Sequence, residues 1–446
     1  MAPIDRSLPP DTRLSLRIYN LLFPIVLLAL LPGVLLRMFR RGGFREKFGQ
    51  RLAFYSAEDL VRFRSREWLW IHSISVGETF IALKLARAIH GLDPNAGILL
   101  STTTSTGFAE ARKAAGDWLE PIYNPIDSRR IVRRALDAVK PRKVFLIEGE
   151  AWPNFVAECW RRDILVSLVN ARLSPRSERR FQRWRRWTGP IFRLLDRVFV
   201  PEPDDVSRWK NLGVEPSRLI CTGSIKFDQP AISSTREAEF RALLATLGVA
   251  IGAPILVAGS TWHPEESTLA EVVLSLRTKH PDLFLILVPR HVERFPEIIR
   301  QLAPLGLKIV RRSQPPPDAR DRPDVLLIDV TGELRDWYAL ATVTFIGKSL
   351  PGIAEVGGQN PAEPAALGKP IVFGPHMENF AALVAGLLRV EAAVQIQTAA
   401  DLLPAFAALL ASPDRRASLG EHARVALAAH AGATARTATL LMADER

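Results

Sequence analysis

Cysteine is almost absent from this chain. Its 446 residues contain only Cys159 and Cys221, which lie far apart and in no metal-ligand spacing. The eight histidines are scattered, and no pair of aspartates is placed to hold a metal ion on a diphosphate. These absences exclude a disulfide scaffold and a zinc domain. If the chain carries out chemistry, we expect it to be metal-independent and to need no cofactor.

Long hydrophobic runs are also absent, with one exception. Residues 18–36 contain no charged side chain, and they lie between Arg17 and the cluster of Arg37, Arg40 and Arg41. A signal peptide would end in small residues, whereas this run ends in arginines. Since a bilayer takes about 20 apolar residues to span, the run predicts a membrane anchor that either just spans the bilayer or lies in one leaflet. The larger basic cluster follows the run, which predicts the main body on the cytoplasmic side of the membrane. A buried core helix is the alternative.

Acidic residues are in the minority: 47 Asp and Glu stand against 59 Lys and Arg, which gives a net charge of +12. Such an excess suits nucleic acid, an anionic membrane or phosphorylated substrates. No recognised nucleic-acid-binding module accompanies it, so we expect no nucleic acid partner. A basic patch interleaved with Phe181, Trp184 and Trp187 suits anionic lipid head groups, or equally a solvated helix face. Its arginines are Arg176, Arg179, Arg180, Arg183, Arg185 and Arg186.

Short apolar runs alternate with amphipathic segments along the rest of the chain. They predict strands at residues 69–72, 97–102, 143–147, 164–169 and 197–200, and, after a loop-rich break near Asp228, at 255–258, 283–288, 325–328, 343–346 and 370–373. This alternation predicts an α/β fold of two doubly wound, Rossmann-like domains that face each other across a cleft.

The predicted boundaries are 1–41 for the anchor and its basic flank, 42–228 for the N-terminal α/β domain and 229–446 for the C-terminal α/β domain. Because the alternation starts only near Trp68, we expect residues 1–36 to be dispensable for folding.

Carboxylates and a lysine stand at predicted strand ends in the first half. Glu78 follows the first strand at the start of a helix, where it suits a general base or a plain capping charge. Glu148 and Glu150 follow the strand that ends at residue 147, and one of the two is expected to be structural. Lys226, near the domain boundary, suits an anionic group in the cleft.

The second half offers candidates for binding a nucleotide. Pro289 and Arg290 end a strand, and arginine suits phosphate. Thr331, Gly332 and Glu333 follow another strand. A glycine-rich loop leads into Asn360, Pro361, Ala362 and Glu363, where a helix N-terminus would bind phosphate and Glu363 would accept hydrogen bonds from ribose.

Taken together, these segments resemble the family of 3-deoxy-D-manno-octulosonic acid (Kdo) transferases. The resemblance rests on segments 72–79, 148–154, 170–174, 223–228, 260–266, 289–295, 332–334, 360–364 and 374–376, and it covers nearly the whole chain. It implies a GT-B glycosyltransferase with an N-terminal membrane anchor helix. The first α/β domain would bind the acceptor and the second the nucleotide sugar, CMP-Kdo.

The implied reaction is an inverting transfer of Kdo from CMP-Kdo to a lipid A precursor, lipid IVA, in lipopolysaccharide core biosynthesis. The resemblance makes Glu78 the general base, and it gives Glu148 and Lys226 the role of stabilising the transition state. It also implies CMP contacts at Pro289, Arg290, Thr331, Gly332, Glu333, Asn360, Pro361, Ala362 and Glu363.

The chain departs from the family pattern at a few positions. Trp262 stands where the family has a histidine, Lys348 where it has a glycine, and Gln359 where it has a histidine. Two other functions fit the same architecture. One is another GT-B lipopolysaccharide glycosyltransferase that uses a UDP- or ADP-sugar, and the other is a membrane-tethered bilobal binding protein.

Overall fold

The computed structural model describes residues 6–41, 47–149, 151–173, 175–228, 236–315, 322–354 and 356–443. The chain forms two compact units, of which unit 1 comprises Met1–Asp228 and Gly432–Arg446, and unit 2 comprises Gln229–Ala431. The last helix therefore belongs with unit 1, and not with the second domain where the sequence analysis places it. Two hydrogen bonds hold that helix to unit 1: Lys143 Nζ donates to the Leu441 carbonyl over 2.7 Å, and Thr437 pairs with Thr222 over 3.0 Å.

Unit 1 is built on a parallel sheet in the order β3-β2-β1-β4-β5-β6-β7. Its strands are β1 (Trp68–Ser73), β2 (Gly97–Thr102), β3 (Leu119–Tyr123), β4 (Lys143–Ile147), β5 (Leu165–Val169), β6 (Arg197–Val200) and β7 (Leu219–Cys221). Strands β1 to β3 extend the sheet in one direction, and strands β4 to β7 extend it in the other. The switch point of this doubly wound sheet therefore lies between β1 and β4, which is where such sheets bind ligands.

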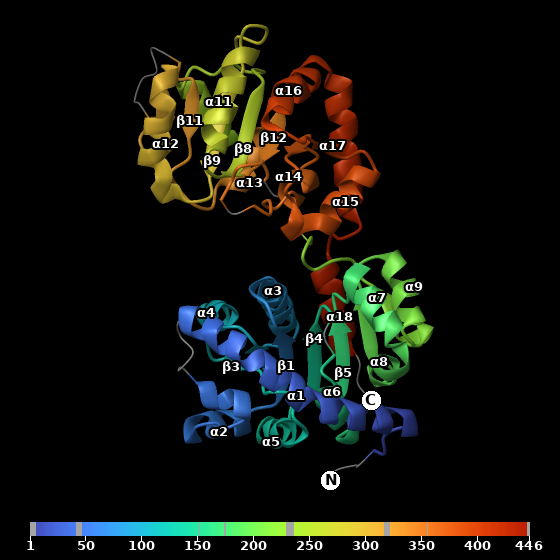
Figure 1. Cartoon of the computed structure of the whole chain (residues 1–446). Coiled ribbons are helices and arrows are strands. Elements are labelled where there is room, and N and C mark those ends of the chain that lie inside the picture. Colours follow the sequence, from blue (N-terminus) through green and yellow to red (C-terminus); the bar gives the residue numbers. More distant parts are fainter. Residues whose placement is uncertain are drawn as a thin grey trace. The chain divides into compact units, whose positions relative to one another are not determined.

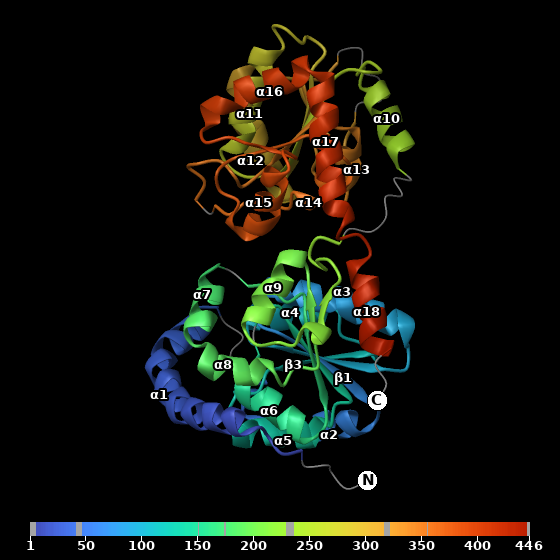
Figure 2. The ribbon, with the colours of Figure 1, turned by 90° about the vertical axis from the view of Figure 1, so that its right-hand side faces the viewer.

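Helices cover both faces of this sheet (Figures 1 and 2). They are α1 (Pro10–Arg41), α2 (Ala57–Arg64), α3 (Val76–Leu92), α4 (Ser105–Lys113), α5 (Arg129–Val139), α6 (Pro153–Arg161), α7 (Pro175–Arg183), α8 (Arg185–Phe192), α9 (Pro203–Asn211) and α18 (Ala433–Ala443). Successive strand residues point to opposite faces. Trp68 and Trp70 of β1 accordingly pack with α5, α6, α8 and α9, whereas Leu69 and Ile71 pack with α3, α4 and α18.

Helix α1 packs onto unit 1, which argues against the expectation that residues 1–36 are dispensable for folding. Leu8 and Leu16 are only 4% and 6% exposed and belong to the hydrophobic core beneath α6 and α8. Asn20 and Asn154 of α6 donate to each other's side-chain oxygens over 3.0 and 2.8 Å. Deleting this segment would therefore uncover core surface and leave Asn154 without this partner.

The same helix is also apolar over much of its length. Within the described residues, Pro10–Ala29 is the one helical stretch long and apolar enough to cross a membrane, judged by length and composition alone. Between Leu21 and Leu28 most of its apolar side chains are exposed, and Leu21 is 71% exposed.

Unit 2 repeats the architecture, with a parallel sheet in the order β10-β11-β9-β8-β12-β13-β14. Its strands are β8 (Ile255–Thr261), β9 (Phe284–Pro289), β10 (Ile309–Arg311), β11 (Val325–Leu327), β12 (Val343–Ile346), β13 (Ile371–Phe373) and β14 (Val394–Gln395). Its helices are α10 (Glu237–Thr246), α11 (Glu265–Leu276), α12 (Phe295–Leu302), α13 (Leu334–Leu340), α14 (Ala362–Ala366), α15 (Ala381–Arg389), α16 (Leu402–Ala411) and α17 (Pro413–Ala428). The switch point of unit 2 lies between β8 and β12.

All ten predicted strands are present, and the prediction of two doubly wound α/β domains is confirmed. Four further strands, β3, β7, β10 and β14, were not predicted.

Candidate active site

Glu78 lies beside the switch point of unit 1, one turn after β1. Ser75 caps helix α3, and its Oγ accepts from the Glu78 N–H over 3.3 Å. In return Glu78 accepts from the Ile74 N–H over 2.8 Å and from Ser75 Oγ over 3.1 Å. Glu78 therefore does help to cap helix α3, which was the alternative to a role as general base. A carboxylate accepts up to about four hydrogen bonds, so capping and proton acceptance are compatible on this side chain.

Glu148 follows β4, on the other side of the same switch point. It adopts the left-handed backbone conformation with φ 64°, which is disfavoured for residues with a side chain. Burial raises the pKa of the Glu148 carboxyl, and the charges of Lys226 and Arg172 oppose that rise. Gly149 follows, and a Cβ there would come within 3.2 Å of the Arg172 carbonyl. Glu150 lies outside the described residues.

Lys226 completes this cluster from the loop after β7. Burial lowers the pKa of its ammonium group, and Glu148 opposes the change. The two side chains therefore favour each other's charged form. The structure brings Glu148 and Lys226 close enough for their charges to interact, and the catalytic role expected for them stays a prediction.

Asn170 fixes the loop that carries Lys226, and the sequence analysis gave it no individual role. It follows β5 with φ 55° and is 3% exposed. Its Oδ1 accepts from the Ile225 N–H over 3.0 Å and from Ser224 Oγ over 3.3 Å. Lys84 of α3 holds the same loop from the other side by donating to the Ile225 and Asp228 carbonyls. An asparagine directly after a buried strand was the only sequence signal for this contact.

His72 links β1 to the start of α6 and is a scaffold residue. Burial lowers its pKa to about 3, so the imidazole is neutral at pH 7. Nε2 accepts from Trp152 Nε1 over 3.2 Å. The proton therefore sits on Nδ1, which donates to Ser101 Oγ over 2.9 Å.

The predicted nucleotide contacts lie at strand ends of unit 2. Pro289 ends β9, and the exposed Arg290 follows it with its backbone N–H donated to the Thr261 carbonyl over 3.1 Å. Thr331 and Gly332 are exposed. Glu333 is buried and paired with Arg236 over 3.1 Å and with Arg312 over 2.9 Å. Those two arginines give Glu333 a structural role whatever it binds.

The loop at Asn360–Glu363 differs from the expected helix N-terminus. Pro361 is the N-cap residue of α14, which has only five residues, so its dipole adds little to the binding of an anion. The Ala362 N–H is already donated to Asn360 Oδ1 over 3.0 Å. Asn360 Nδ2 lies 3.4 Å from Glu363 Oε1 and orients that carboxylate. The side chains, more than the helix end, are thus what this loop offers to a ligand.

No group of three His, Cys, Asp or Glu side chains suited to a metal ion occurs among the residues that the structure describes. Metal independence and the absence of a cofactor stay predictions.

Two doubly wound parallel sheets, with charged side chains at their strand ends, are typical of the GT-B fold. The Anabaena protein Alr3699/HepE, solved in complex with UDP, shares this fold. It is 13% identical, covers 85% of this chain and 100% of its own, and superposes with a TM-score of 0.50.

Sequence comparison defines the family. The family model described as 3-Deoxy-D-manno-octulosonic-acid transferase (kdotransferase) matches residues 46–229. The 3-deoxy-D-manno-octulosonic acid transferase of Bordetella pertussis is 35% identical over 83% of this chain and 85% of its own. The enzyme of the same name from Haemophilus influenzae is 30% identical over 89% of this chain and 91% of its own. The chain therefore belongs to the 3-deoxy-D-manno-octulosonic acid transferase family of glycosyltransferases.

Proposed function

We propose that this protein transfers Kdo from CMP-Kdo to the sugar backbone of a lipid A precursor, lipid IVA, with inversion and with Glu78 as the general base. The observation that carries the proposal is the position of Glu78 in a member of this family. Its carboxylate lies beside the switch point of unit 1, with the Glu148–Lys226 pair on the strands across it.

In the proposed reaction Glu78 removes the proton from an acceptor hydroxyl as that oxygen attacks the anomeric carbon of Kdo. The bond from this carbon to the phosphate oxygen of CMP breaks, and CMP leaves with the bonding electrons. Arg290, after β9 of unit 2, stabilises the negative charge that develops on the leaving phosphate. Lys226 contributes positive charge beside Glu148 in unit 1. The charge of Glu148 favours the protonated form of Lys226 and so opposes the lowering of its pKa by burial.

Turnover of the Glu78→Gln variant tests the base. The amide keeps the shape and one acceptor oxygen but takes up no proton, so turnover should fall by about 10²–10⁴-fold while CMP still binds. Asp59→Asn is the matched control, because Asp59 forms the same kind of cap with Ser56 on α2. Near wild-type turnover in Glu78→Gln would leave Glu78 as a cap and place the base elsewhere.

Product analysis tests the substrates. Mass spectrometry after incubation with CMP-Kdo and a tetraacylated lipid A precursor should show the acceptor extended by Kdo. Calorimetry should show that CMP binds and UDP does not. Preference for UDP would favour a different sugar donor for this fold.

Arg290→Ala and Glu363→Ala test the donor site in unit 2. Each removes a hydrogen bond that involves a charged group, which is worth about 1.5–3 kcal/mol. Both variants should bind CMP more weakly, the first through phosphate and the second through ribose. Unchanged CMP affinity in both would show that these loops do not hold the nucleotide.

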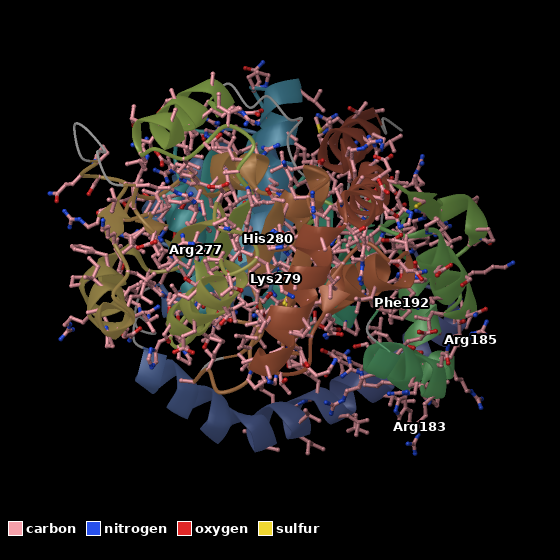
Figure 3. All side chains as sticks on the ribbon, turned by 90° about the horizontal axis from the view of Figure 1, so that it is seen from above. Arg183, Arg185, Phe192, Arg277, Lys279 and His280 are labelled. Carbon is pink, nitrogen blue, oxygen red and sulfur yellow. The ribbon has the colours of Figure 1, made fainter. Side chains whose placement is uncertain are left out.

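We propose further that α1, α7 and α8 together bind the cytoplasmic face of the inner membrane. Helix α8 packs against α1, so the basic patch and the exposed apolar side chains of α1 belong to neighbouring helices. Trp184 is 52% exposed, and Figure 3 shows Arg183 and Arg185 pointing away from the ribbon. The outward apolar side chains of α1 include Leu21, Leu22, Ile25, Val26 and Leu28.

Flotation with anionic liposomes tests this surface. Charge contacts at a surface are screened beyond about 8 Å at physiological salt, so replacing Arg183 and Arg185 by Glu should weaken binding most at low salt. Lys279→Glu makes the same kind of change in unit 2 and should have no effect. Equal binding by all variants at every salt concentration would contradict a role for the basic patch.

A further inference from the structure

Lys348 holds a backbone conformation that favours glycine. It follows β12 with φ 61°, in the left-handed region that residues with a side chain rarely adopt. The backbone is fixed there from both sides. Its N–H donates to Glu265 over 2.8 Å, and its carbonyl accepts from the Gly358 N–H over 2.9 Å. A lysine side chain is thus kept at a position where it strains the fold.

The Lys348 ammonium group lies over an aromatic platform. Its Nζ is 4.4 Å from the centre of the Trp262 ring, within the range of a cation–π contact. The Trp262 ring in turn meets His291 edge-on, with 5.1 Å between ring centres. One oxygen of the buried Glu265 accepts from the backbone N–H groups of both Trp262 (2.9 Å) and Lys348 (2.8 Å). That carboxylate therefore holds the two residues side by side.

This pair sits at the switch point of unit 2. Trp262 directly follows β8, and Lys348 comes two residues after β12, the two strands that flank the switch point. Ligands of doubly wound sheets bind at this place. The neighbouring loop is tied in as well, since the Gln359 N–H donates to the Gly347 carbonyl over 3.1 Å. Lys348 thus adjoins the loop that leads to Glu363. Trp262 beside it contacts His291, the residue after Arg290.

We propose that Lys348 is a specificity-determining residue of the donor site. Its ammonium group binds an anionic oxygen of the sugar nucleotide, and Trp262 orients the lysine side chain. The inference rests on the proposed function and deepens it. A CMP-activated sugar acid offers two such groups, the carboxylate of the sugar and the phosphodiester. The side chain that strains the backbone is then retained for binding and not for stability.

Kinetics and unfolding of Lys348→Gly, Lys348→Gln and Lys348→Arg test this. Lys348→Gly should unfold at the same or a higher temperature than the wild type, because glycine relieves the strain. Its KM for CMP-Kdo should rise by about 10–100-fold, the factor expected for losing a charged hydrogen bond. Lys348→Gln should show the same rise in KM, and Lys348→Arg should retain most of the affinity.

Lys140→Gly is the matched control. Lys140 has φ 51° at the C-terminus of α5 in unit 1, so the substitution relieves the same strain and should leave KM unchanged. Inhibition by CMP identifies the anion that Lys348 binds. Weaker CMP inhibition in Lys348→Gly, in step with KM, would assign it to the phosphate. Unchanged CMP inhibition beside a raised KM would assign it to the sugar carboxylate.

Two results would overturn the inference, and they are distinguishable. A Lys348→Gly variant that unfolds earlier with unchanged KM would make Lys348 a structural partner of Trp262 only. A wild-type protein that does not turn over CMP-Kdo would remove the proposed function, and this inference with it.

Discussion

Asn170 should set the position of Lys226. The contacts of Asn170 also allow an estimate of how much its replacement lowers the free energy of unfolding. Replacement by alanine leaves the buried Ile225 N–H without its acceptor, which costs about 1–3 kcal/mol. Alanine at φ 55° adds about 1–2 kcal/mol of backbone strain. We therefore expect Asn170→Ala to lower the free energy of unfolding by about 2–5 kcal/mol.

Two companion variants separate these contributions. Asn170→Gly loses the acceptor, but glycine adopts the left-handed conformation without strain. This variant should therefore be about 1–2 kcal/mol more stable than Asn170→Ala. Asn170→Asp keeps an acceptor for both donors and should stay closest to the wild type. Urea unfolding with an unchanged slope measures all three. Equal stability of the alanine and glycine variants would refute the strain, and wild-type stability in both would refute the hydrogen bonds.

The same variants test whether Asn170 acts through Lys226. Asn170→Gly should lower turnover because the loop at Ser224 and Ile225 loses its tie. If Asn170 only positions Lys226, adding this change to Lys226→Ala should cost little further turnover. Losses that multiply in the double variant would give Asn170 a role of its own.

The remaining predictions concern unit 1. Leu16→Ala should lower the free energy of unfolding by about 2–4 kcal/mol, as expected for a buried leucine. Leu21→Ala, on the exposed side of α1, should change it by less than about 0.5 kcal/mol. Equal effects of the two variants in thermal unfolding would mean that α1 does not pack as described. Burial raises the pKa of Asp127 to about 6, against the hydrogen bonds from Asn154, Tyr19 and Phe155, while the unfolded value is about 3.9. Between these two pH values the folded state binds more protons at Asp127 than the unfolded state does. The contribution of this proton to the free energy of unfolding is therefore fully present below about pH 4 and is lost as the pH rises through 6. Asp127→Asn should flatten this part of the stability–pH curve, and an unchanged curve would place the titration elsewhere.

The strands that the sequence analysis missed share a position in the fold. β3 and β7 are the edges of the unit 1 sheet, and β10 and β14 are the edges of the unit 2 sheet. Central strands of a parallel sheet are covered on both faces and read as continuous apolar runs. An edge strand has no such requirement: β3 contains Glu120 and Pro121, and proline is tolerated only at an edge. β7, β10 and β14 are two or three residues long and partly exposed.

The candidate site divides in a similar way. Glu78, Glu148 and Arg290 could be predicted as candidates because parallel strands bring their carboxyl ends to one edge, so a polar residue after an apolar run is informative. Contacts between distant loops leave no such pattern. The tie from Asn170 to Ile225 spans β5 and β7, and Glu265 gathers N–H groups from Trp262 and from the loop after β12. The apolar run of α1 concealed Asn20, whose amide pairing with Asn154 shows that the helix docks.

The placement of α18 has a consequence for the order of folding. Ala438 and Leu441 of this helix complete the apolar layer over α3, yet the chain makes them after the whole of unit 2. Asp228 marks the return point, because its carboxylate accepts from the Gly432 and Thr434 N–H groups over 2.8 and 2.7 Å. During synthesis on the ribosome, unit 1 therefore begins to form first but is completed only after unit 2 has been made. Until then the α3 face stays open to solvent, and a nascent or truncated chain that lacks residues 432–443 exposes a sticky surface to chaperones and proteases.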